Sequence, residues 1–111
     1  MKVRGTLKKN SDFRRLYAKG KSAVTPYLVL YVRPNRLGEN RVGYTVSAKL
    51  GHAVVRNRVR RRLREIYRLI APSLRSGFDL IVVARSCAVG CPYRKLEAAF
   101  LRACDSVGLT P

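Results

Sequence analysis

Hydrophobic and polar residues alternate in two stretches of the chain, which predicts two β-strands. Residues 27–33 read YLVLYVR and residues 41–47 read RVGYTVS, both with the β-branched and aromatic residues that favour strands. Alternation divides the first stretch into two sides, with Leu28, Leu30 and Val32 on one and Tyr27, Tyr31 and Arg33 on the other. The intervening PNRLGEN has turn-forming residues, so we predict a hairpin between the two strands. SAVT, at residues 22–25, predicts a short edge strand before them.

Apolar residues recur at helical spacing towards both ends of the chain. Residues 10–20 place Phe13, Leu16 and Tyr17 on one helix face, with Gly20 as the stop. After Cys91–Pro92, a helix is predicted by one core-facing stripe: Leu96, Phe100, Ala103, Cys104 and Val107. The segment FDLIVVAR, at residues 78–85, is apolar at nearly every position, which is typical of a central strand.

Residues 53–70 combine a narrow apolar stripe with many arginines. On a helix of about 100° per residue, the stripe consists of Val55, Val59, Leu63, Ile66 and Ile70. We expect the stripe to pack on the sheet and Pro72 to end the helix. A row at i, i+4 spacing is formed by Arg56, Arg60, Arg64 and Arg68. Most of the remaining circumference is occupied by Asn57, Arg58, Arg61 and Arg62.

In chain order the predicted elements are α-β-β-β-α-β-α. They indicate an α+β fold, a single-domain α–β sandwich of roughly four strands and three helices over residues 1–111. Residues 1–9 carry a second basic cluster, which is either part of a binding surface or a solvated arm. The first residues have charges but no apolar signal-peptide core, and no run approaches the length of a membrane span. We therefore expect a cytoplasmic protein without membrane association.

The arginines need an explanation beyond solubility. Like charges at i, i+4 destabilise a helix by roughly 0.2–0.5 kcal/mol per pair, and Glu65 compensates only one or two of them. The formal net charge is +18, from 24 Lys and Arg against 6 Asp and Glu. A surface charged for solubility alone normally mixes both signs, whereas a one-signed arginine face is typical of nucleic-acid binding. An anionic membrane surface is the lesser alternative.

Aromatic residues near the cations favour RNA over DNA. Rings that suit stacking on unpaired bases are supplied by Phe13, Tyr17, Tyr27 and Tyr31. Aromatics at such spacings are also common in cores, so both interpretations stay open. Two other classes of protein explain the charge: a structural RNA-binding protein such as a ribosomal protein, and a DNA-binding protein that reads a groove.

No residue set for protein-based catalysis is visible. The sequence lacks a Gly-rich phosphate loop and a Ser/His/Asp set, and its acidic residues are scattered. Cys87, Cys91 and Cys104 are odd in number, which fits a reducing compartment better than a disulfide framework. The single histidine, His52, is distant from them in sequence, so we expect no zinc site and no metal site on the protein.

The segment GHAVVRNRVRRRLRE resembles the signature of the protein subunit of bacterial ribonuclease P, G-N-A-V-x-R-N-R-x-K-R-x-x-R. The segments LKKNSDFRRLYAKGKS, YLVLYV, RVGYTVSAKLG and FDLIVVAR resemble that family in the same order, so the resemblance covers nearly the whole chain. The chain departs from the pattern at His52, where the family usually has asparagine, and at Tyr17, often phenylalanine.

The resemblance implies a ribonucleoprotein in which a large RNA performs Mg²⁺-dependent removal of the 5′ leader from precursor tRNA. The protein would bind the catalytic RNA and hold the leader, and the crossover through the arginine helix would be left-handed. RNA-subunit-binding residues would be Lys49, Arg56, Asn57, Arg58, Arg60, Arg61, Arg64 and Arg68. The leader cleft, between the first helix and the sheet, would be lined by Phe13, Tyr17, Tyr31 and Arg33.

Overall fold

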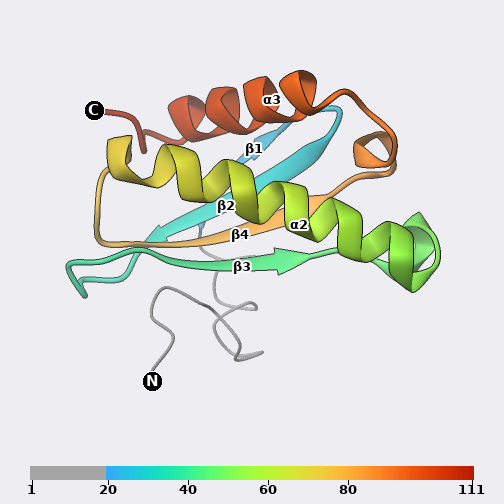
Figure 1. The fold of residues 1–111 in the computed structure, drawn as a ribbon. Helices are drawn as coiled ribbons and strands as arrows, with labels where there is room; N and C mark the ends of the chain where they lie inside the picture. The colour runs from blue at the N-terminus through green and yellow to red at the C-terminus, as the bar shows by residue number, and fades with distance from the viewer. Residues whose placement is uncertain (1–19) are drawn as a thin grey trace.

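The computed structural model of the chain describes residues 20–111 (Figure 1). Four strands and two α-helices follow one another in this range: β1 (Lys21–Val24), β2 (Leu28–Pro34), β3 (Arg41–Thr45), α2 (Ala53–Ile70), β4 (Phe78–Ala84) and α3 (Tyr93–Ser106). Three single 3-10 turns join them: η1 (Ala48–Leu50), η2 (Ala71–Ser73) and η3 (Ser86–Ala88). The helix predicted for residues 10–20 lies outside the described residues, Gly20 excepted. The four strands, including the edge strand, and both α-helices of the described range were predicted, whereas the three 3-10 turns were not.

The four strands form one mixed sheet in the order β1-β2-β4-β3. Strand β4 pairs antiparallel with β2 and parallel with β3, so it lies between the two strands that were predicted to form a hairpin. The hairpin prediction was therefore wrong, although the turn after β2 does reverse the chain. Because β4 is apolar on both faces, with Leu80, Ile81 and Val82 fully buried, the centre of the sheet suits it best.

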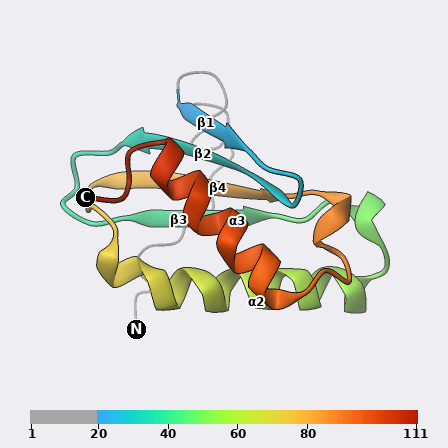
Figure 2. The same cartoon turned by 90° about the horizontal axis from the view of Figure 1, so that it is seen from above.

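Helices α2 and α3 lie on the same face of the sheet (Figures 1 and 2). One core cluster joins their apolar stripes to the helix-facing residues of β2 and β4, and its fully buried members include Leu28, Leu30, Leu63, Ile66, Leu80, Val82, Leu96 and Phe100. The stripe predicted for α3 is buried in full. Tyr27 also packs against this core, so its predicted grouping with Tyr31 was wrong. Tyr27 precedes β2, where the strand's alternation does not yet apply.

The sheet face opposite the helices carries both apolar and charged residues. Ile81 is buried there, with Tyr31 and Val83 packed against it. The strand register places Tyr31 next to Ile81 and Arg33 next to Asp79. This face of β2 therefore presents an aromatic residue and, two positions further on, a cation. The predicted alternation of β2 is confirmed for Tyr31 and Arg33.

Candidate nucleic-acid interface

Helix α2 is held by its apolar stripe. Val59, Leu63, Ile66 and Ile70 are buried, while Val55 in the first turn is half-buried. The helix ends at Ile70, and Pro72 lies in the following turn as predicted. Helix α2 lies on the sheet (Figure 1). Because its apolar stripe faces the sheet, the arginines between the members of the stripe lie on the sides of the helix and towards solvent.

The entry into α2 depends on backbone geometry that few residues allow. Gly51 has φ 142°, a conformation that L side chains rarely adopt, and a Cβ there would approach the Val55 side chain to 3.2 Å. In the preceding turn η1, the side chain of Ser47 accepts a hydrogen bond from the Lys49 backbone N–H. The Lys49 side chain is exposed beside the start of the arginine helix. His52 occupies the N-cap position without a side-chain capping bond.

The exposed part of the arginine face consists of Asn57, Arg58, Arg61, Arg64 and Arg68. Arg56 and Arg60 belong to the same row in sequence, yet both are half-buried, so the row begins at the edge of the apolar stripe and turns outwards along the helix. Arg60 donates a hydrogen bond to the Asn57 side-chain oxygen over 3.0 Å. The Nε of Arg56 is buried and has no hydrogen-bond partner.

Two exposed arginines have partners that orient them. The guanidinium of Arg64 lies over the ring of Tyr44, 5.9 Å from its centroid, within the range of a cation–π contact. Arg68 forms an ion pair of 2.7 Å with Glu65, whose pKa it lowers through its hydrogen bond. Glu65 is the single acidic residue of the α2 sequence and is thereby paired at the far end of the helix. The other exposed cations of this face keep their charge available to a polyanion.

Arg62 forms a hydrogen bond within the protein that the sequence did not predict. Its Nη1 donates a hydrogen bond of 2.8 Å to the backbone carbonyl of Cys91, in the loop that leads into α3. The interaction joins residues 29 positions apart in the sequence, which no periodicity could predict. Arg62 is therefore distinct from Arg61 beside it, which is exposed.

The predicted leader cleft is described only in part. Tyr31 and Arg33 lie half-buried on the sheet face opposite the helices, as their alternation predicts. Phe13 and Tyr17 lie outside the described residues, as does the basic cluster in residues 1–9. Tyr31 packs against Ile81, so its ring has a firm support on the sheet.

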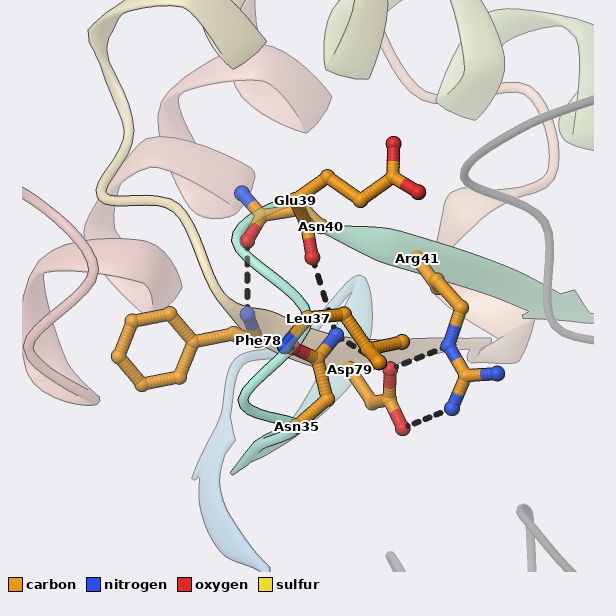
Figure 3. A network of polar contacts seen from close by, with 7 residues as sticks. All are labelled: Asn35, Leu37, Glu39, Asn40, Arg41, Phe78 and Asp79. Carbon is orange, nitrogen blue, oxygen red and sulfur yellow. Dashed lines mark hydrogen bonds and ion pairs between the residues drawn. The ribbon is translucent and has the colours of Figure 1, made fainter.

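A polar network surrounds Asp79 at the end of the sheet (Figure 3). Asp79 is the strand partner of Arg33. Asp79 accepts hydrogen bonds from Arg41 Nε at 2.8 Å and Nη2 at 2.7 Å, and from the Asn35 side chain at 2.9 Å. Burial of Asp79 opposes its ionisation, but these donors outweigh that effect and hold its pKa below the usual range. Asn40 links the same turn to the Phe78 N–H and the Arg75 carbonyl. The sequence does not predict this network, because its members are far apart in the chain.

The described cysteines are all free thiols. Burial raises the pKa of Cys104 to about 12, which disfavours the thiolate that metals bind. Within residues 20–111, no three His, Cys, Asp or Glu side chains come together as a candidate metal site. Neither helix of this range has an apolar stretch of the length that a bilayer span requires.

The chain is small and strongly basic, and its α+β fold combines an arginine face on one helix with an aromatic residue on the sheet face opposite the helices. These features are typical of nucleic-acid-binding proteins. Comparison with known proteins narrows this class. The family model of ribonuclease P matches residues 1–108. The ribonuclease P protein component of Natranaerobius thermophilus is 50% identical over 97 residues, which cover 87% of this chain and 84% of that protein.

A second relative and a solved structure agree with this match. The ribonuclease P protein component of Alkaliphilus oremlandii is 42% identical over 109 residues, or 98% of this chain and 96% of that protein. The RNase P protein of Staphylococcus aureus superposes with a TM-score of 0.89 at 30% identity, covering 98% of this chain and all of that one. The chain therefore belongs to the ribonuclease P protein family. Its role is that of a ribonuclease P subunit, acting in RNA binding and tRNA processing.

Proposed function

We propose that the arginine face of α2 binds the catalytic RNA near the cleavage site. The residues that would make these contacts are Lys49, Arg56, Asn57, Arg58, Arg60, Arg61, Arg64 and Arg68. The observation that carries this proposal is the one-signed charge of a helix that is fixed to the sheet by its opposite, apolar side. Arginine suits the task because its planar fork engages a phosphate through two hydrogen bonds. Arg68 is paired with Glu65. To bind RNA, Arg68 would either leave this ion pair or contact a phosphate while keeping it.

We further propose that the sheet face opposite the helices receives the single-stranded 5′ leader of precursor tRNA. Tyr31 would stack on an unpaired base and Arg33 would neutralise a phosphate, together with Phe13 and Tyr17. The support from the described residues is the adjacency of Tyr31 and Arg33 on one face of β2 and the packing of Tyr31 on Ile81. Stacking on a held aromatic ring tolerates any base, as a subunit that processes many tRNA precursors requires.

Hydrolysis itself is assigned to the RNA subunit. We propose that Mg²⁺ is held mainly by RNA, because the described residues provide no cluster of metal ligands. The protein would lower the Mg²⁺ concentration that the RNA subunit needs for cleavage, because the cations of the protein neutralise phosphates that metal ions would otherwise screen. Two features of the chain support a cytoplasmic location: its free thiols and a charge suited to RNA.

Three structural details complete the proposal. Residues 1–111 would act as one RNA-binding domain, with residues 1–9 as a basic arm and a first helix in residues 10–20. The connection from β3 through α2 to β4 joins adjacent parallel strands, so it has a defined hand. We propose the left-handed sense that the family resemblance implies, opposite to the usual right-handed crossover. A structure of residues 1–111 bound to the catalytic RNA and precursor tRNA tests all three.

Processing of precursor tRNA at low Mg²⁺ tests the function. The purified protein, added to precursor tRNA and the catalytic RNA, should increase the rate of leader removal and tighten precursor binding. A structural RNA-binding protein of equal charge should not do so, and it serves as the control. An unchanged rate at every protein concentration would contradict the proposal.

A further inference from the structure

A polar hollow of about 570 Å³ opens at the end of the sheet where β2 passes into its turn. It is lined by Arg33, Pro34, Asn35, Arg36, Arg41 and Asp79. Among these described residues three side chains are cationic and one is anionic, so together they carry a surplus of two positive charges. Glu39, on the same turn, is exposed and does not line the hollow. In Figure 3 its carboxylate is directed away from Asp79.

Asp79, the carboxylate among the described residues that line the hollow, is already engaged. Asp79 accepts two hydrogen bonds from Arg41 and one from Asn35, with distances of 2.7–2.9 Å. The sheet register places Arg33 on one side of Asp79 and Arg41 on the other. Arg33 therefore adds a second cation beside a carboxylate whose oxygens Arg41 has taken. Arg33 has no carboxylate of its own among the described residues, so its positive charge attracts an additional anion.

Arg33 and Arg36 have side chains available for that anion. Neither makes an ion pair or a side-chain hydrogen bond with any residue in the range 20–111. Arg36 has φ 60°, which is uncommon for a residue other than glycine or asparagine. The turn that holds it is fixed by Asn35, which accepts from the Leu37 N–H at 2.8 Å and donates to the Glu39 carbonyl at 3.0 Å. A fixed turn reduces the entropic cost of filling the site.

We propose that this hollow binds a backbone phosphate of the precursor tRNA leader, adjacent to the nucleotide that stacks on Tyr31. The inference rests on the proposed function and extends it to a second contact on the same sheet face. Arg33 follows Tyr31 by two residues on β2, a separation of roughly 7 Å along the strand. A base held on Tyr31 would thus bring a neighbouring phosphate to Arg33 and Arg36, whose guanidinium groups bind phosphate well.

The proposal predicts a dependence on leader length. We would measure binding of the reconstituted holoenzyme to precursor tRNAs whose leaders lengthen one nucleotide at a time. The test variant combines Arg33→Gln with Arg36→Asn, since asparagine tolerates positive φ. The control variant combines Arg94→Gln with Arg102→Gln, which removes the same charge from exposed positions on α3. Thermal unfolding of both variants verifies that they are folded.

The wild-type affinity should rise in a step once the leader reaches the hollow. In the test variant this step should be absent, with long-leader precursors bound roughly three- to tenfold more weakly and a salt slope flatter by about 0.7. Short-leader precursors and mature tRNA should bind as to the wild type. Replacing both arginines by lysine keeps the charge and should recover most of the salt slope.

Two results would overturn the proposal in different ways. In the first, the test variant binds every tRNA ligand more weakly to the same degree and also assembles more weakly with the catalytic RNA. The phosphate bound by the hollow would then belong to the catalytic RNA and not to the leader. Unchanged binding at all leader lengths would show that the hollow holds no phosphate. An Arg58/Arg61/Arg64 alanine variant, measured in parallel, distinguishes the failures. If it binds RNA more weakly while the hollow variant does not, only the hollow is wrong; if neither changes, the proposed function fails too.

Discussion

The side chain of Arg62 donates a hydrogen bond to the backbone carbonyl of Cys91, and this bond ties the arginine helix to the loop before α3. Arg61, its neighbour in the sequence, is exposed. The two arginines are chemically identical and differ only in what they contact. Substitutions at these two adjacent positions can therefore distinguish an effect on the stability of the fold from an effect on the affinity for RNA.

Alanine at each of these two positions should give opposite results. Arg62→Ala removes the donor from the Cys91 carbonyl and should lower the free energy of unfolding by about 1 kcal/mol, a few degrees in Tm. Arg61→Ala should leave Tm unchanged or slightly raised, because alanine favours helices and one like-charge repulsion is removed. Thermal unfolding and RNA titration of both variants check this. Equally weakened RNA binding with no change in stability would contradict the structural role of Arg62.

The arginine face should act on RNA through phosphate charge. The variant Arg58→Ala/Arg61→Ala/Arg64→Ala should bind the catalytic RNA more weakly, because fewer phosphates are neutralised. Its plot of log K against log [salt] should be flatter by up to about 0.7–0.9 for each phosphate that the variant no longer binds. The Arg94→Gln/Arg102→Gln pair on α3 serves as the charge control. Filter binding over a salt series gives both quantities, and a slope identical to that of the wild type would mean that these arginines do not bind RNA.

The helices and strands of this fold could be predicted from the sequence because each depends on the spacing of apolar residues within a short segment. The stripe of α2 and the stripe of α3 appear where helical spacing places them. The pairing of strands was not readable, since β4 separates β2 from β3 through pairs as distant in the chain as Leu28 and Ala84. The same limit applies to the site. Charge identified the arginine face, but the bond of Arg62 to Cys91 and the Arg41–Asp79 pair arise only from the folded arrangement.

Asp79 should make stability depend on acid pH. Its pKa is lowered in the folded state, so its contribution is present above the unfolded value near pH 4 and disappears as pH falls through the folded pKa. Asp79→Asn should therefore be less stable than the wild type at pH 7, and the difference should shrink towards pH 3. Urea unfolding midpoints at several pH values measure it. A difference that stays constant with pH would contradict the assignment.

Cleavage chemistry should not depend on any protein carboxylate. The acidic residues to be replaced singly by their amides are Asp12, Glu39, Glu65, Asp79, Glu97 and Asp105. Single-turnover cleavage by the holoenzyme at saturating protein should stay nearly constant in every variant, because the RNA performs hydrolysis. A general acid or base contributes about two orders of magnitude or more. A decrease of that size in a folded variant would place catalysis on the protein.

Tyr31 should distinguish a leader-binding subunit from a general RNA binder. Stacking of a base on an aromatic ring contributes roughly 1–3 kcal/mol, so Tyr31→Ala should weaken binding of precursor tRNA to the holoenzyme about tenfold. Mature tRNA, which has no leader, should bind as before, and assembly with the catalytic RNA should persist because α2 is unchanged. Tyr31→Phe keeps the ring and is the matched control, with affinity close to that of the wild type.

Because Tyr31 packs against Ile81, its replacement also removes contacts within the protein. Circular dichroism and thermal unfolding of Tyr31→Ala must therefore precede the binding measurements. A folded Tyr31→Ala variant that weakens precursor and mature tRNA equally would assign Tyr31 to packing alone. The leader would then lie elsewhere, whereas weakening confined to the precursor places an unpaired nucleotide on this face of β2.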